Sequence, residues 1–151
     1  MIKDNEPKLI EYNIRFGDPE CQVLMMRLKN DLLDLILSVF ENNLDKQKII
    51  WSKKPCITVV AANKGYPTKF KKNTEIRNIH KIKQNENFQL FHAGTNKDEK
   101  GKIRATGGRV LNATVIANSL RDARHQANNI LDNIDWENKY YRKDIGFKAI
   151  D

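Results

Sequence analysis

Residues 9–20 decide how this sequence is interpreted, and they read Leu9-Ile-Glu-Tyr-Asn-Ile-Arg-Phe-Gly-Asp-Pro-Glu20. Apolar and polar residues alternate through the first half of this stretch. The alternation predicts a β-strand over residues 8–15, because successive side chains of a strand point to opposite faces. One face would turn its apolar side chains toward a core: Ile10, Tyr12 and Ile14. The opposite face would bring together Glu11, Asn13 and Arg15.

The end of the same stretch predicts the start of a helix. Asp18 suits the N-cap, Pro19 suits the first helical position, and Glu20 places a negative charge in the first turn. Apolar residues then recur at helical spacing, which predicts one helix from Pro19 to Phe40. The apolar surface of this helix is broad, so we expect it to be buried on more than one side.

The polar face of the predicted strand has the chemistry of a metal and phosphate site. Carboxylate and amide oxygens, such as those of Glu11 and Asn13, suit Mg²⁺, which usually shares its coordination sphere with nucleotide phosphates. The guanidinium of Arg15 would offer a forked donor to a phosphate or a carboxylate. The spacing alone fits equally well an ion pair between Glu11 and Arg15 on an exposed strand face.

Residues 11–20 resemble the metal-binding strand of the ATP-grasp ligases, and four later blocks narrow this resemblance to one family. The blocks, in order, are Val59-Val-Ala-Ala-Asn-Lys-Gly-Tyr-Pro67, Phe91-His-Ala-Gly-Thr95, Gly107-Gly-Arg-Val-Leu111 and Tyr141-Arg-Lys-Asp-Ile-Gly146. Together they resemble the glycinamide ribonucleotide synthetases, which are phosphoribosylamine–glycine ligases. The first block alone would indicate only the superfamily. Another ATP-grasp carboxylate–amine ligase is therefore the alternative.

The resemblance implies an enzyme that uses ATP to join glycine to 5-phosphoribosylamine through glycyl phosphate, in purine biosynthesis. It implies that Glu11 and Asn13 hold Mg²⁺ or Mn²⁺ between nucleotide phosphates. Arg15 would be the catalytic residue that grips the acyl phosphate or the glycine carboxylate. Substrate-binding roles are implied for Asp18 and Arg109, although an N-cap role would also account for an aspartate at position 18.

The resemblance also implies an α+β fold in two parts. Residues 1–48 would be the C-terminal end of an ATP-grasp domain, a strand plus a long helix. Residues 49–151 would be the family's small C-terminal domain, an antiparallel β-rich unit with one main helix. A strand and a helix cannot close a core alone. We therefore expect N-terminal domains of the same, longer polypeptide as partners, and we expect the isolated chain to be inactive.

Local patterns in the second part predict most of its elements. Short β-branched or alternating runs predict strands over residues 56–62, 88–93, 102–105 and 109–116. Residues 96–101 are polar and predict a hairpin loop. Ser119, with Asp122 three residues later, predicts the start of a helix that continues to Ile134. Gly107 and Gly108 fit either a phosphate-binding turn or an ordinary tight turn.

Charge and composition argue against a secreted or membrane protein and leave a nucleic-acid-binding protein as an alternative. The net charge is +8 and the pI is about 9.5, so a basic nucleic-acid-binding module is an alternative. The excess is lysine scattered over several loops, which favours a solvated surface and no nucleic-acid partner. The N-terminus lacks an apolar signal, and no run approaches the roughly 20 apolar residues of a membrane span. We expect a cytoplasmic protein with no membrane partner and with reduced Cys21 and Cys56.

Overall fold

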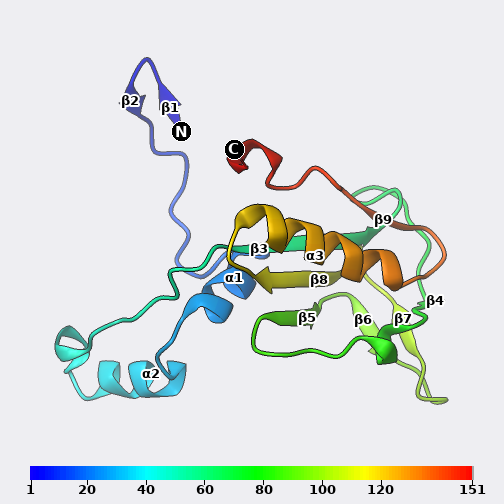
Figure 1. Cartoon of the computed structure of the whole chain (residues 1–151), viewed down its shortest axis with the longest axis horizontal. Coiled ribbons are helices and arrows are strands. Elements are labelled where there is room, and N and C mark those ends of the chain that lie inside the picture. Colours follow the sequence, from blue (N-terminus) through cyan, green and yellow to red (C-terminus); the bar gives the residue numbers. More distant parts are fainter. Residues whose placement is uncertain (151) are drawn as a thin grey trace.

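A four-stranded antiparallel sheet forms the centre of the computed structural model, which describes residues 1–150 (Figure 1). Its strands, in spatial order, are β5 (Phe88–His92), β8 (Arg109–Ile116), β3 (Cys56–Asn63) and β9 (Lys139–Tyr141). Helix α3 (Leu120–Asn133) packs on β3 and β8. Helix α1 (Glu20–Arg27) packs on the same two strands from the other face (Figure 1).

The hydrophobic core lies between this sheet and α3. Side chains of β3 alternate between buried and half-buried, because every second residue points toward α3. The helix contributes its small and branched residues Ala123, Ala127 and Leu131, all of which are fully buried. Every buried hydrophobic side chain among the described residues lies between Ile57 and Trp136. The first third of the chain therefore adds nothing to the core.

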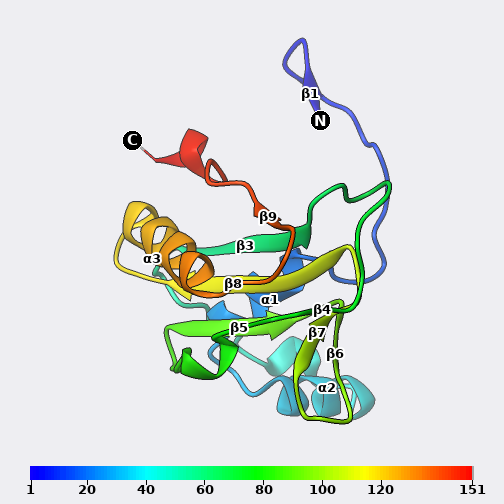
Figure 2. The same ribbon diagram turned by 90° about the vertical axis from the view of Figure 1, so that its right-hand side faces the viewer.

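A second, smaller sheet lies beside the first (Figure 2). Its three strands, in order, are β4 (Thr74–Glu75), β7 (Ile103–Ala105) and β6 (Thr95–Lys97), all antiparallel. Single 3-10 turns occur at η2 (Ile79–Lys81) and η3 (Phe147–Ala149). No helix among residues 1–150 is both long and apolar enough to cross a membrane.

Most of the elements predicted for residues 49–151 are confirmed. Strand β8 has the predicted bounds, and β3, β5 and the β6–β7 hairpin agree within a few residues. Ser119 caps α3 as predicted, because its hydroxyl accepts the N–H of Asp122. The α+β class with antiparallel sheets is confirmed. The assignment of residues 1–48 to an ATP-grasp domain stays a prediction.

The prediction of a strand over residues 8–15 is wrong for this chain. Residues 8–19 form no strand, and the only N-terminal strands are the short pair β1 (Ile2–Lys3) and β2 (Glu6–Pro7) among the residues described. The side chains expected in a core are exposed instead: Ile10, Tyr12 and Ile14. The alternating pattern is present, but no described strand lies beside it to accept its hydrogen bonds.

The prediction of one helix from Pro19 to Phe40 is also wrong. The chain forms α1 and a separate helix α2 (Leu32–Phe40), followed by the 3-10 turn η1 (Leu44–Lys46). The break occurs because Leu28 is extended and bridges Trp51, and because the Asp31 carboxylate caps α2 by accepting the N–H of Leu33. Asp18 is not the N-cap of α1, since Pro19 holds that position without a side-chain hydrogen bond.

Asn63 joins the end of β3 to two distant segments. Its amide donates to the carbonyl of Gly107 at 2.8 Å, and its side-chain oxygen accepts the indole N–H of Trp136 at 2.7 Å. Its backbone N–H donates to the carbonyl of Gly108 at 2.8 Å. Asn63 and Trp136 are only 1% and 2% exposed. Asn63 therefore helps to fix the position of the Gly107–Gly108 turn.

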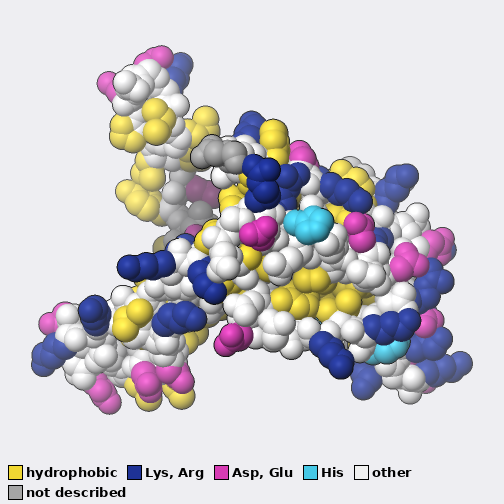
Figure 3. Space-filling model, in the orientation of Figure 1, with side chains coloured by type: hydrophobic (Ala, Val, Ile, Leu, Met, Phe, Trp, Pro, Cys, Tyr) yellow, Lys and Arg dark blue, Asp and Glu magenta, His cyan; other side chains and the backbone are white. Residues whose placement is uncertain are grey.

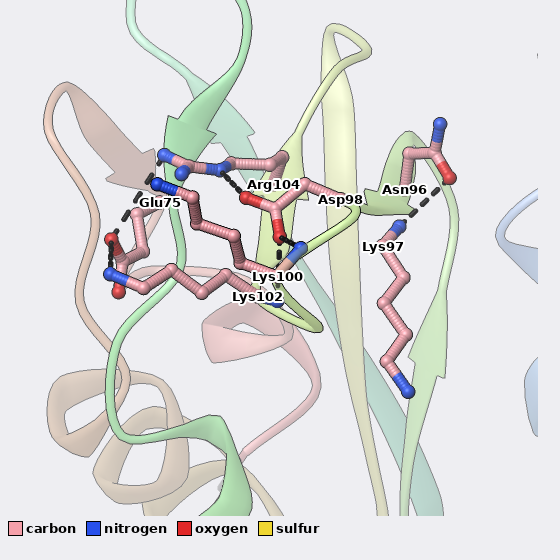
Figure 4. A network of polar contacts seen from close by, with 7 residues as sticks. All are labelled: Glu75, Asn96, Lys97, Asp98, Lys100, Lys102 and Arg104. Carbon is pink, nitrogen blue, oxygen red and sulfur yellow. Dashed lines mark hydrogen bonds and ion pairs between the residues drawn. The ribbon is translucent and has the colours of Figure 1, made fainter.

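Asp98 organises the β6–β7 hairpin (Figure 4). One carboxylate oxygen accepts the N–H groups of Lys100 and Lys102, and the other accepts from Arg104 Nε at 2.8 Å. The N–H of Lys102 and the Arg104 side chain hold the pKa of Asp98 below its ordinary value of 3.8. Lys102 in turn donates to Glu75 on β4, which joins the hairpin to the next strand (Figure 4).

Replacing Asn63 with alanine should destabilise the fold. The indole N–H of Trp136 and the carbonyl of Gly107 would lose their partners inside the protein. A buried polar group without a partner costs about 1–3 kcal/mol, so we expect the free energy of unfolding to fall by about 3 kcal/mol in urea titrations. Asn118→Ala, at an exposed loop position, is the matched control and should change it by less than about 0.5 kcal/mol. Equal effects would contradict the role of Asn63.

The β6–β7 hairpin should depend on pH only in strong acid. Because its pKa is lowered on folding, Asp98 stabilises the hairpin above its unfolded pKa, and this contribution is lost as the pH falls through the folded value. A ¹³C NMR titration should place the Asp98 midpoint below 3.8. Arg104→Gln should raise that midpoint, whereas Lys97→Gln in the same hairpin should change it little. A wild-type midpoint at or above 3.8 would refute this assignment.

Candidate functional site

The three residues of the predicted metal and phosphate face lie on the exposed segment before α1. Asn13 donates from its amide nitrogen to Glu11 at 3.0 Å, so these two side chains do lie together. Arg15 donates to the carbonyl of Phe16 at 3.1 Å and contacts neither of them through a hydrogen bond or an ion pair in the described residues. The ion pair between Glu11 and Arg15 that the spacing allowed is absent from residues 1–150.

The donor set at this segment suits a hard cation but is incomplete. Glu11 and Asn13 offer carboxylate and amide oxygens, the ligand types that Mg²⁺ and Mn²⁺ accept. The described residues contain no group of three or more His, Cys, Asp and Glu side chains that could hold a metal. A metal held here would need further oxygen ligands from a nucleotide, from water or from another protein segment.

Asp18 and Arg109, the two predicted substrate-binding residues, meet although 91 positions separate them. Arg109 donates from Nη1 to the backbone carbonyl of Asp18 at 2.7 Å, and Nη2 lies 2.9 Å from its carboxylate. The other carboxylate oxygen of Asp18 accepts from Gln22 on α1 at 3.1 Å. These contacts attach the segment before α1 to the first residue of β8.

A cavity of about 290 Å³ opens beside this contact. Its floor is the sheet face opposite α3, formed by alternate residues of β3, and its walls are largely aromatic. The residues that line it are Pro19, Thr58, Val60, Ala62, Tyr66, Arg109, Tyr140, Tyr141, Arg142 and Ile145. An apolar floor with a few polar groups at the rim is typical of a small-molecule site.

Two arginines give the cavity its positive groups, and each is held by a carboxylate. Arg142 donates to both carboxylate oxygens of Asp144, at 3.0 and 2.7 Å. This pairing fixes the plane of its guanidinium and leaves further N–H groups free to bind a ligand. Tyr141 donates its hydroxyl to Asp132, and burial together with that carboxylate raises its pKa, so the phenol stays protonated.

Close packing requires glycine at positions 107 and 108, and position 108 lies against the cavity wall. A Cβ at Gly108 would lie 2.1 Å from a ring carbon of Tyr66, so this ring rests directly on the glycine backbone. The N–H of Gly107 donates to the carbonyl of Gly94 at 3.0 Å. This N–H is therefore occupied, which favours the tight-turn interpretation of Gly107. The glycines place Tyr66 and Arg109 on the same cavity wall.

Of the lining residues, only Arg109 was predicted to bind a substrate, and those that the sequence reasoning missed include Tyr66, Tyr140 and Arg142. Two of them stand inside blocks that carried the family resemblance, since Tyr66 precedes Pro67 and Arg142 follows Tyr141. The blocks could have marked these two residues as candidates, but nothing in the spacing of the blocks indicates that residues 66 and 142 line one cavity. Only the pairing of β3 with β9 brings these segments together.

Exposed ion pairs neutralise part of the positive charge of the lysine-rich loops. Lys and Arg side chains gather along the right-hand edge of the molecule in Figure 3. Several of the chain's Lys and Arg side chains are paired with carboxylates, including Lys71 with Glu137 and Arg77 with Asp135. These exposed pairs reduce the local positive potential. The arrangement lends no specific support to the nucleic-acid alternative.

Comparisons with known proteins agree on one family. The profile of the family described as "Phosphoribosylglycinamide synthetase, C domain" matches residues 56–148. The phosphoribosylamine–glycine ligase of Brucella melitensis is 48% identical over 151 residues, which is 100% of this chain and 35% of that protein. The chloroplastic ligase of Arabidopsis thaliana is 42% identical over 149 residues, 98% of this chain and 28% of that protein.

A solved structure gives the same result. The crystal structure of phosphoribosylamine–glycine ligase from Thermotoga maritima has a TM-score of 0.72 and 28% sequence identity, over 95% of this chain and 34% of that one. The chain thus spans about a third of the length of these relatives and matches their C-terminal part. The chain belongs to the phosphoribosylglycinamide synthetase family and contains its C domain.

Proposed function

We propose that this chain is the C-terminal part of an ATP-dependent phosphoribosylamine–glycine ligase. The reaction joins glycine to 5-phosphoribosylamine through glycyl phosphate and yields glycinamide ribonucleotide, ADP and phosphate. The observation that carries the proposal is the match to the Brucella melitensis ligase, at 48% identity over the whole chain. Because the match covers 35% of that ligase, the N-terminal domains of the longer polypeptide would complete the enzyme.

Glu11 and Asn13 would hold the metal, and Arg15 would act on the transferring phosphoryl group. A bound Mg²⁺ or Mn²⁺ would neutralise charge on the phosphates of ATP. The two side chains already lie within 3.0 Å of each other, which supports a shared ligand. Arg15 is exposed, and within residues 1–150 its one hydrogen bond goes to its neighbour's carbonyl, so its guanidinium is available to bind glycyl phosphate or the glycine carboxylate.

The cavity beside Asp18 and Arg109 suits the phosphorylated amine. Arg109 uses two nitrogens on Asp18 and retains further N–H groups that could bind a phosphate. The Tyr66 ring would cover the apolar face of the ribose, because that ring forms the cavity wall next to Gly108. Asp18 would orient the amine through its carboxylate. With the phosphate on Arg109, the sugar end would lie beside the segment that carries Arg15, since Arg109 contacts Asp18.

The test uses a full-length chimera in which this chain replaces the C-terminal third of the Brucella melitensis ligase. We expect ADP release that requires both glycine and 5-phosphoribosylamine, and no release by the isolated chain. Glu11→Gln and Arg15→Ala should each lower kcat by about 100-fold or more, because electrostatic stabilisation of the phosphoryl group is lost. Release that is indifferent to glycine would instead indicate another ATP-grasp ligase.

Arg109→Lys in the same chimera should separate the two substrates. A lysine keeps the charge but loses the forked geometry, so the KM for 5-phosphoribosylamine should rise about 10-fold or more while the KM for glycine stays nearly constant. Arg77→Lys is the matched control, since Arg77 is also in an exposed ion pair but lies outside the cavity. An equal rise in both KM values would remove Arg109 from the phosphate site.

A further inference from the structure

A polar cavity of about 490 Å³ opens beside the smaller sheet and is here called the β4–β7 cavity. Its lining residues all lie between Lys71 and Glu137, inside the region that the C-domain profile matches. Among residues 1–150 it shares no lining residue with the cavity beside Arg109. Its volume falls within the roughly 300–1,000 Å³ of small-molecule sites. The C domain therefore has a second candidate site of its own.

The lining of the β4–β7 cavity has a net positive charge, because cationic side chains outnumber carboxylates. The cations are Lys71, Lys72, Arg77 and Arg104, and the carboxylates are Glu75 and Glu137. Strands β4 and β7 lie at the right of Figure 1, where Figure 3 shows Lys and Arg side chains gathered. A cavity with such a lining favours an anionic ligand over an apolar one.

Two guanidinium groups in the cavity are held by carboxylates and keep further donors free. Arg104 donates from Nε to Asp98 at 2.8 Å, and its terminal nitrogens donate no hydrogen bond within residues 1–150 (Figure 4). One of these nitrogens, Nη1, lies 4.0 Å from Glu75. Arg77 donates from a single Nη to Asp135 at 2.5 Å. Guanidinium N–H groups fixed in this way match the oxygens of a phosphate.

The two lysines of the cavity are available to a ligand as well. Lys72 makes no ion pair within residues 1–150, and its Nζ lies 5.7 Å from the centre of the Phe70 ring. Lys71 donates to both carboxylate oxygens of Glu137, at 2.9 and 2.8 Å, but both side chains are more than half exposed. An ion pair so exposed contributes little stability. A ligand could therefore share Lys71 at small cost.

Thr74 gives independent evidence that the cavity is incomplete when empty. The residue lines the cavity and is only 7% exposed. Its hydroxyl is buried and has no hydrogen-bond partner within residues 1–150. Buried hydroxyl groups in proteins are nearly always paired, either with the protein or with a bound molecule, because an unpaired one is destabilising. A ligand with acceptor oxygens would satisfy this group.

We propose that the β4–β7 cavity binds a phosphate ester of a small metabolite. Arg77 and Arg104 would donate to the phosphate oxygens, Lys72 would supply the unpaired charge, and the hydroxyl of Thr74 would donate to the same group. A phosphate carries nearly two negative charges at pH 7, which balances the net positive lining. Because the cavity is separate from the one beside Arg109, this inference does not depend on the proposed function.

Titration of the ¹⁵N-labelled chain with ADP, ribose 5-phosphate and inorganic phosphate at low salt tests the site. We expect the amides of residues 71–77 and of Arg104 to shift together, with a Kd of about 1 mM or tighter for at least one probe. Arg109→Gln should leave these shifts unchanged. Tighter binding of ADP than of the others would identify a nucleotide, and equal binding would identify recognition of the phosphate alone. No saturable shift with any probe would overturn the proposal.

Charge-matched variants separate a specific site from general attraction to a basic protein. Lys72→Gln should weaken binding of the tightest probe by about 5-fold or more, because a direct charge on the phosphate is lost. Lys83→Gln removes the same charge at an exposed position outside the cavity and should change the Kd by less than about 2-fold. Equal effects of the two variants would show that the cavity is not a specific site.

Thr74→Val distinguishes a ligand-binding threonine from a structural one. Without ligand, the variant should keep or raise the thermal midpoint, because it removes a buried hydroxyl that has no partner. It should weaken binding of the same probe by about 5-fold or more. A lowered midpoint with unchanged affinity would assign Thr74 to the fold and overturn its role. The full-length chimera should bind the probe with the affinity of this chain, and loss of binding there would also overturn the proposal.

Discussion

The antiparallel pairing of β3 with β8 is the interaction on which the rest of the structure depends. The two strands pair from Cys56 opposite Ile116 to Ala62 opposite Arg109. Their alternation gives α3 one face and α1 the other, so both helices are fixed by the same pair of strands. A register shift between Ala61 and Ala62 bends the ladder at the end where Arg109 begins β8. Such irregularities commonly redirect a side chain next to a functional site.

The cavity also forms at this end of the β3–β8 pair. Asn63 follows the register shift and holds the Gly107–Gly108 turn through two hydrogen bonds, one from its side chain and one from its backbone, and its side-chain oxygen accepts a third from Trp136. That turn sets the position of the Tyr66 ring and of Arg109. The cavity wall is thus built on the hydrogen-bonded end of the sheet, whereas Glu11, Asn13 and Arg15 lie on a segment outside any strand or helix.

The sequence predicted correctly those elements whose hydrophobic pattern is matched by packing partners within the same part of the chain. Strand β8 and the capped helix α3 satisfy their hydrogen bonds and apolar faces within residues 56–136, so periodicity and capping were sufficient. The predictions of a strand over residues 8–15 and of one helix to Phe40 were wrong for different reasons. The alternating pattern of residues 8–15 has no strand beside it in residues 1–150. Breaks such as the one at Leu28 depend on a tertiary bridge, here to Trp51, and no local pattern encodes it.

The candidate site was predictable in its residue types but only partly in its geometry. The family blocks singled out Asp18 and Arg109 separately, and the fold brings them into contact. That contact has a consequence for the metal-binding half of the site. Residues 9–16 precede the contact at Asp18 and make no backbone hydrogen bond to the rest of residues 1–150, so any metal bound there must also fix the segment. The entropic cost of ordering the segment reduces the affinity.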